Sequence, residues 1–239
     1  MSEAFTISSL NYKGPEMIEE QSPVLLKRQY NTIILAGIGI AILFYPVVSY
    51  LVYSKSMLPL MRFFISRVAM WVTLPLLYQY AHKVEDRPFL IWKEQPKSIY
   101  FYVASIALLS LMSFYANRIS TIPELLGFHD DYRSIRYWNK LLKENMPMNV
   151  LACVTAGVTE ELINRGYIYP RLCLLFKSPI LPLFISSLFF SLMHMGYDNL
   201  GEYIFTFIFG LCCALFYRRF RNIQTLIIFH FIYDMIASF

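Results

Sequence analysis

The sequence predicts an all-α fold, a polytopic bundle of transmembrane helices. Of its 239 residues, 57% are hydrophobic and only 15% are charged, whereas soluble domains average about 25% charged residues. The apolar residues also gather in runs close to the roughly 20 residues that a helix needs to cross the hydrocarbon core of a bilayer. We therefore expect an integral, multi-pass membrane protein.

The N-terminal half predicts a tail, three spans and a surface segment. Residues 1–30 carry charged residues throughout and lack a sustained apolar run, so they predict a soluble N-terminal tail. Apolar runs at 31–53, 63–81 and 98–116 predict three spans, with Pro46 and Pro75 as interruptions. Basic residues alternate with Trp138 and several leucines over 117–146, a pattern typical of an amphipathic helix on the membrane surface. Residues 31–146 thus predict N-terminal transmembrane helices with an amphipathic surface loop.

The C-terminal region, residues 147–239, predicts four more spans in quick succession, at 147–175, 180–197, 202–217 and 223–238. The last two are short for a full crossing and need flanking residues to complete it. We expect about seven spans in total, with six to eight as the range. No repeat or separate domain is visible, so the helices predict one integrated membrane domain.

Ionisable residues interrupt these C-terminal apolar segments. A charged group near the bilayer centre costs about 2.5–3.5 kcal/mol on insertion scales, so several such groups are expected to face one another or water. The sequence therefore predicts a shared polar site inside the bundle. Its members are Glu160, Glu161, Arg165, His194, His230 and Asp234.

Helical spacing assigns partners within this set. Glu161 and Arg165 are four residues apart and lie on one helix face, where they predict an ion pair. Glu160 is turned by about 100° from Glu161, so its carboxylate stays available for chemistry. His230 and Asp234 share a face in the same way.

A carboxylate and a histidine held together in a dry site can activate water for hydrolysis. Glu160 is the expected base with His194, and His230 and Asp234 are candidates for stabilising the oxyanion. The same four residues also form a plausible ligand set for a divalent metal such as zinc. The HExxH motif of zincins is absent from the sequence. The residues alone leave the metal-free and the zinc alternatives open, and no cofactor is assigned.

The polar residues fall into three short motifs in a fixed order. They read Glu160-Glu161-x-x-x-Arg165, Phe190-x-x-x-His194 and His230-x-x-x-Asp234. Their order and spacing resemble the signature of the CPBP family, which comprises type II CAAX prenyl endopeptidases and bacterial Abi or bacteriocin-processing-like membrane proteins. The resemblance covers roughly the last ninety residues. It implies a helical intramembrane endopeptidase, which we expect in a bacterial plasma membrane.

The resemblance also implies roles for the motif residues. Glu160 would activate water with His194, Glu161 and Arg165 would support the site, and His230 with residue 234 would bind the oxyanion. The family is often labelled metalloprotease, although a metal-free glutamate mechanism has also been argued for its prenyl-protein members. In the prenyl endopeptidases residue 234 would typically be asparagine. Because an ionised aspartate only accepts hydrogen bonds, Asp234 must be protonated, orient His230 or ligate a metal.

The expected function is hydrolysis of a peptide bond in a membrane-associated peptide or protein, with a membrane-bound peptide precursor as the favoured substrate. The lipid bilayer is the other expected partner, and the oligomeric state is left open. Nucleic acid is not expected, because no basic stripe exists outside the juxtamembrane loops.

Two alternatives stay open. One is a non-catalytic membrane adaptor or bacteriocin self-immunity or regulatory protein that retains the motifs for structure. The other, less favoured, is a proton-coupled transporter, against which stand the short chain and the lack of paired halves.

Overall fold

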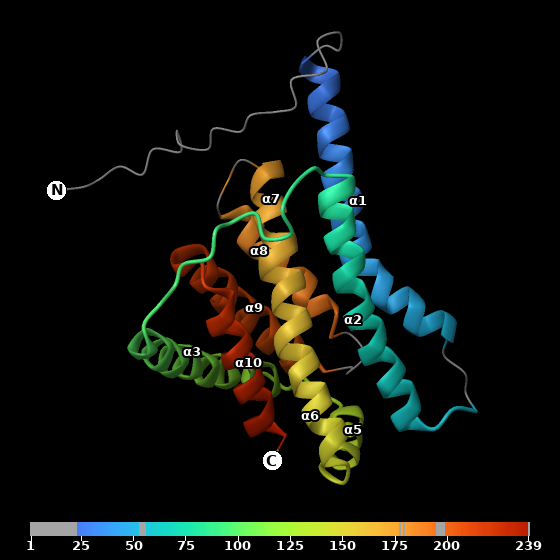
Figure 1. Cartoon of the computed structure of the whole chain (residues 1–239). Coiled ribbons are helices and arrows are strands. Elements are labelled where there is room, and N and C mark those ends of the chain that lie inside the picture. Colours follow the sequence, from blue (N-terminus) through green and yellow to red (C-terminus); the bar gives the residue numbers. More distant parts are fainter. Residues whose placement is uncertain (1–22, 53–55, 177, 179, 195–198, 239) are drawn as a thin grey trace, which may run out of the picture.

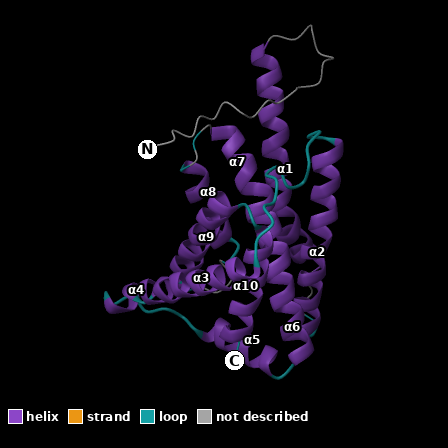
Figure 2. Cartoon of the chain, turned by 60° about the vertical axis from the view of Figure 1, so that its left-hand side comes forward, coloured by secondary structure: helices purple, strands orange, loops and turns teal. Residues whose placement is uncertain are grey.

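The computed structural model describes residues 23–52, 56–176, 178, 180–194 and 199–238. Helices connected by loops make up this part of the chain, and it contains no strand (Figure 2). The all-α fold class is thereby confirmed.

The helices α1 (Pro23–Val52) and α2 (Pro59–Lys83) lie side by side (Figure 1). α1 begins at Pro23, within the predicted tail, and residues 1–22 of that tail lie outside the described residues. Pro75 lies inside α2 without ending it. Pro46 lies inside α1. The C-terminal part of that helix turns outward from the bundle (Figure 1).

The next helices are α3 (Ile99–Ser120), the short α4 (Ile122–Leu125) and α5 (Arg133–Lys143). α3 lies across the other helices and packs against α9 (Leu200–Phe220) (Figure 2). The amphipathic helix predicted within 117–146 is present as α5, which has no buried residue. Its Trp138 ring lies 5.4 Å from the ring of Phe63 in α2.

The predicted span at 147–175 is one continuous helical stretch, but its central turns are π-helical rather than α-helical. It begins with α6 (Met146–Thr155), continues through π-helical turns at Ala156–Glu160 (η2) and Leu162–Ile168 (η3), and ends with α7 (Tyr169–Phe176). Such wider turns are rare and frequently occur at functional sites. The regular α-helical phasing expected around Glu160 is therefore wrong, because both π-helical segments fall on the first motif.

The remaining helices are α8 (Leu181–Leu192), α9 and α10 (Ile223–Ala237). α8 packs closely along α9, and residues 195–197 of the predicted fifth span lie outside the described part of the chain. One apolar cluster joins α3, α8, α9 and α10 around Phe190, Phe209 and Phe229. A second joins α1 and α2 to η3 around Leu77 and Ile168. The first motif thus lies between two apolar clusters.

The loop between α2 and α3 fastens one end of the bundle. Glu85 accepts hydrogen bonds from Nε of Arg171 at 2.8 and 3.0 Å and from the Tyr167 hydroxyl at 2.7 Å. Glu94 accepts bonds from the Tyr217 hydroxyl at 2.8 Å and from the backbone N–H of Ile223 at 2.6 Å. This loop therefore ties α7, the end of α9 and the start of α10 together.

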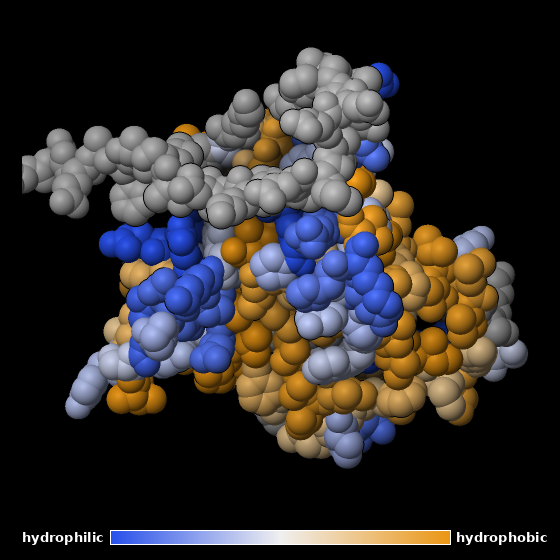
Figure 3. Space-filling view, turned by 45° about the horizontal axis from the view of Figure 1, so that its top comes forward, coloured by the Kyte–Doolittle hydropathy of each residue, from blue (hydrophilic) through white to orange (hydrophobic). Residues whose placement is uncertain are grey.

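The surface of the molecule is suited to a bilayer. Among the residues that the structure describes, four helical stretches are long and apolar enough to cross a membrane, Arg28–Val52, Pro59–Lys83, Ile99–Leu125 and Leu200–Phe220, while α8 and α10 are shorter apolar helices. Large apolar side chains such as Leu43, Leu51 and Val103 are exposed on α1 and α3. Figure 3 shows hydrophilic residues gathered at one end and hydrophobic surface beside them. The chain is an integral membrane protein, and the count of about seven spans stays a prediction.

Candidate active site

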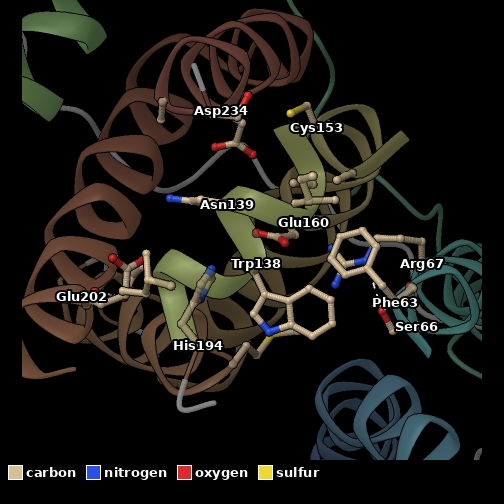
Figure 4. A pocket seen from close by; sticks show the side chains of 18 of the residues that line it. Phe63, Ser66, Arg67, Trp138, Asn139, Cys153, Glu160, His194, Glu202 and Asp234 are labelled. Carbon is tan, nitrogen blue, oxygen red and sulfur yellow. Dashed lines mark hydrogen bonds between the residues drawn. The ribbon is translucent and has the colours of Figure 1, made fainter. Parts of the chain in front are cut away.

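A cavity of about 780 Å³ opens between α1, α2, α5, α6, α8, α9 and α10. Glu160, His194, His230 and Asp234 all line it, although they come from three separate segments of the chain (Figure 4). The predicted convergence of the three motifs is therefore present.

Glu161 lies beside the cavity, at the centre of a buried network. Its Oε1 atom accepts a hydrogen bond from Nη1 of Arg165 at 2.8 Å and lies 2.8 Å from Nδ1 of His230. All three side chains are buried, with Glu161 fully excluded from solvent. The predicted pair of Glu161 and Arg165 is present, and the contact with His230 is one that helical spacing did not reveal.

The guanidinium of Arg165 makes two further contacts across helices. Nη2 donates to the carbonyl oxygen of Gly210 in α9 at 3.3 Å, and Cζ lies 4.4 Å from the ring centroid of Phe190 in α8. A buried charge is tolerated when its donors are bonded and its partner is close. These contacts fix the first motif against the helices that carry the other two.

Glu160 has a different environment from its neighbour. It lines the cavity, and its Oε2 atom has no hydrogen-bond partner among the residues that the structure describes. Its backbone carbonyl accepts a bond from Nδ2 of Asn164 at 2.9 Å. Close packing of η2 on α10 holds this segment, because a Cβ added at Gly157 would lie 2.9 Å from the carbonyl oxygen of Ile227.

His194 follows directly after α8. Its Nδ1 atom lies 2.9 Å from the carbonyl oxygen of Phe190. A carbonyl only accepts, so Nδ1 carries the proton in this bond. The Phe190 ring lies 5.0 Å from the His194 ring and also supports Arg165. Phe190 thus positions residues of two motifs at once.

His230 and Asp234 are neighbours on α10, as their spacing predicts. Nε2 of His230 lies 3.6 Å from Oδ2 of Asp234, a separation that allows electrostatic attraction but is too long for a direct hydrogen bond. His230 therefore has one carboxylate at each ring nitrogen, Glu161 at Nδ1 and Asp234 at Nε2.

Three charged cavity residues, Arg62, Arg67 and Glu202, were not identified as site members from the sequence. Glu202 lies in the first turn of α9 beside His194 (Figure 4). Its backbone N–H donates to Oδ1 of Asn199, which caps the start of the helix. In the sequence, Glu202 marked only the start of a predicted span. Arg67 lines the cavity from α2, and in the sequence it marked only the edge of a span.

The zinc alternative has no preformed ligand group in the part of the chain that the structure describes. No group of three or more histidines, cysteines, aspartates or glutamates within the described ranges is placed to hold a metal ion. No step below is routed through a metal.

The fold and the cavity define a class: a helical membrane protein with carboxylates and histidines that line an interior cavity. Residues 143–236 match the model of the family described as type II CAAX prenyl endopeptidase Rce1-like, and all three motifs lie inside this segment. The resemblance predicted from the motifs is confirmed. No curated protein and no solved structure matches the chain. At the level of the family, the match supports a CAAX-type intramembrane protease, a hydrolase.

Proposed function

We propose that this protein hydrolyses a peptide bond in a membrane-associated peptide or protein, with Glu160 as the general base and His194 as its partner. The observation that carries the proposal is the contrast between two adjacent glutamates. Glu161 is held between Arg165 and His230, whereas Glu160 lines a cavity that it shares with His194. One carboxylate is thus structural and its neighbour is available to a substrate.

The reaction needs a water molecule held between Glu160 and His194. The Glu160 carboxylate takes a proton from this water while the water oxygen attacks the carbonyl carbon of the scissile bond. The carbonyl oxygen becomes an oxyanion in the resulting tetrahedral intermediate. When the C–N bond breaks, Glu160 returns the proton to the leaving amine, which balances the step.

His230 is the proposed donor to the oxyanion. A carboxylate accepts only, so Nδ1 of His230 donates to Glu161, and Nε2 is the nitrogen that lines the cavity side beside Asp234. This role requires Nε2 to carry a proton as well, which the Asp234 carboxylate beside it favours, so that Nε2–H donates to the negative charge that develops on the oxyanion. Among the three roles open to Asp234, this geometry favours orientation and charge support of His230.

A non-catalytic adaptor requires the Glu161–Arg165–His230 network for helix packing, but it does not require the Glu160 carboxylate in the cavity. Substitution of Glu160 or His194 therefore distinguishes a protease from an adaptor.

The test is a comparison of membrane-bound and secreted peptides from cells that express the unmutated protein, Glu160→Ala or His194→Ala. Exposed Glu144→Ala is the matched control. We expect a precursor to accumulate and its product to disappear in both site variants but not in the control. Identical peptide profiles from folded, membrane-inserted variants would contradict the protease function and favour the adaptor.

A further inference from the structure

An arginine without an acidic partner lies in the cavity wall that α2 provides. Phe63, Ser66, Arg67 and Met70 line the cavity, and their spacing of three, four and seven residues places them on one helix face. Nε of Arg67 donates to Oγ of Ser66 at 3.3 Å, and Cζ lies 4.7 Å from the Phe63 ring centroid. Neither contact neutralises the charge, and none of the ion pairs within the described ranges includes Arg67.

The charges of the cavity are divided between its walls. The carboxylates of Glu160, Glu202 and Asp234 belong to η2, α9 and α10, whereas the two arginines that line the cavity, Arg62 and Arg67, belong to α2. Figure 4 shows Arg67 and Phe63 on one side of the view and His194 with Glu202 on the other, with Glu160 between them. Trp138 of α5 packs on Phe63, and the Phe63 ring in turn lies against the guanidinium of Arg67.

This arrangement restricts what the cavity can bind. A charged residue in a membrane-spanning helix is retained when it faces a partner or an aqueous path, and it marks a functional site by default. The guanidinium presents a planar fork of donors that matches a carboxylate. The carboxylates of η2, α9 and α10 repel the carboxylate of a bound substrate, so the α2 wall is the favourable place for that carboxylate.

We propose that Arg67 binds a carboxylate of the substrate while the scissile bond lies at Glu160. The inference rests on the proposed function and names its substrate class: a membrane-associated peptide with either a nearby C-terminal carboxylate or an acidic side chain. Phe63 and Trp138 pack against apolar side chains next to that carboxylate. The cavity of about 780 Å³ lies within the roughly 300–1,000 Å³ typical of sites that enclose a small ligand.

The experiment measures binding without turnover. Glu160→Gln protein in phosphatidylcholine nanodiscs is incubated with an N-myristoylated pentapeptide library in three forms: free acid, C-terminal amide, and amide with one internal aspartate. Retained peptides are quantified by mass spectrometry. The same measurement is made on Glu160→Gln protein with Arg67→Gln, and with Arg136→Gln, which removes an exposed arginine of α5 that does not line the cavity.

Peptides with a carboxylate should be retained about tenfold or more over plain amides, the ratio expected for a charge-assisted hydrogen bond. Arg67→Gln should abolish this preference and Arg136→Gln should leave it intact. Retention of the free acid alone identifies the C-terminus as the source, and retention of the aspartate amide identifies a side chain.

Three results would overturn the proposal. The first is equal retention of all three peptide forms by the Glu160→Gln protein, or retention of none of them. The second is a preference for carboxylate peptides that persists in the Arg67→Gln variant. The third is a preference that is lost when the nanodisc contains phosphatidylglycerol. The last result assigns Arg67 to lipid phosphate. Because binding is measured without turnover, these failures are distinct from a failure of the protease function, which the peptide comparison with Glu160→Ala detects.

Discussion

Oε1 of Glu161 lies 2.8 Å from Nδ1 of His230, although 69 residues separate the two in the chain. The same oxygen accepts a hydrogen bond from Arg165 one turn away. A single buried oxygen thereby joins the first motif to the third. It also withdraws Glu161 from the cavity, so the two adjacent glutamates are expected to respond differently to the same substitution.

Glu160→Gln should lower turnover by about 10²–10⁴-fold, the usual contribution of a general base, while leaving the unfolding temperature in detergent unchanged. Glu161→Gln should instead destabilise the protein by about 3–5 kcal/mol, because it leaves the buried Arg165 without its charged partner. Product formation and thermal unfolding of both variants check this difference. Equal stability of the two variants would show that Glu161 is not structural. Adding Arg165→Met to Glu161→Gln should restore part of the lost stability, because it removes the unpaired charge.

Gly157→Ala should separate η2 from α10. The added Cβ would meet the Ile227 carbonyl oxygen at 2.9 Å and the Phe231 backbone nitrogen at 3.1 Å, so one helix must move. We expect a loss of about 1–3 kcal/mol, typical of overpacking, together with reduced turnover as His230 shifts from Glu161. Gly39→Ala is the control, since its Cβ meets nothing within 4 Å. Turnover and unfolding of the two alanine variants should differ, and a harmless Gly157→Ala would contradict the close packing.

Asp130→Ala should weaken the start of α9. Its carboxylate accepts bonds from the backbone N–H groups of Leu200 at 2.8 Å and Gly201 at 2.9 Å, next to Glu202. Loss of such a cap costs about 0.5–2 kcal/mol. Thermal unfolding in detergent measures the effect, and lower turnover should accompany it because Glu202 lines the cavity.

Asp131→Ala is the matched control for Asp130→Ala. Hydrogen bonds from Arg133 lower the pKa of Asp131 from 3.8 to about 2. Any stabilisation from this pair is therefore fully present above about pH 4 and is lost as the pH falls through about 2. The pair is solvent-exposed, so its removal should change stability little at neutral pH. A larger effect of Asp131→Ala than of Asp130→Ala would contradict the assigned cap.

Glu94→Gln should loosen the end of the bundle where the loop between α2 and α3 fastens it. The substitution weakens two bonds, from the Tyr217 hydroxyl and from the Ile223 N–H at the start of α10. Hydrogen bonds to charged groups contribute about 1.5–3 kcal/mol, and we expect a loss of that order in thermal unfolding. Glu144→Gln, at an exposed position after α5, should have no measurable effect. Equal unfolding temperatures of the two variants would show that this loop does not stabilise the bundle.

Much of the site could be predicted from the sequence because it depends on spacing along one helix. Glu161 meets Arg165, and His230 lies beside Asp234, as a separation of four residues requires. The cost of charged groups in apolar segments also predicted that the three motifs share one interior site, and they line one cavity. The amphipathic pattern located α5 for the same local reason.

The π-helical turns and the contacts between helices could not be predicted in this way. Local spacing cannot reveal that η2 and η3 widen the helix at Glu160, because the α-helical and π-helical turns use the same residues. The contact of Glu161 with His230 depends on how each helix is rotated about its own axis. The positions of Glu202 and Arg67 in the cavity depend on which faces of α9 and α2 pack inward.

The sequence by itself determined that this is a helical membrane protein with a polar interior and named the residues of that interior. Insertion into a bilayer restricts which residues a helix can carry and where its charged residues can lie, so these features can be predicted from the sequence alone. Only the tertiary structure decided which glutamate is held in a buried network and which lines the cavity. That difference arises from packing between helices distant in the chain, where Arg165 and His230 meet at Glu161 and Glu160 is left in the cavity.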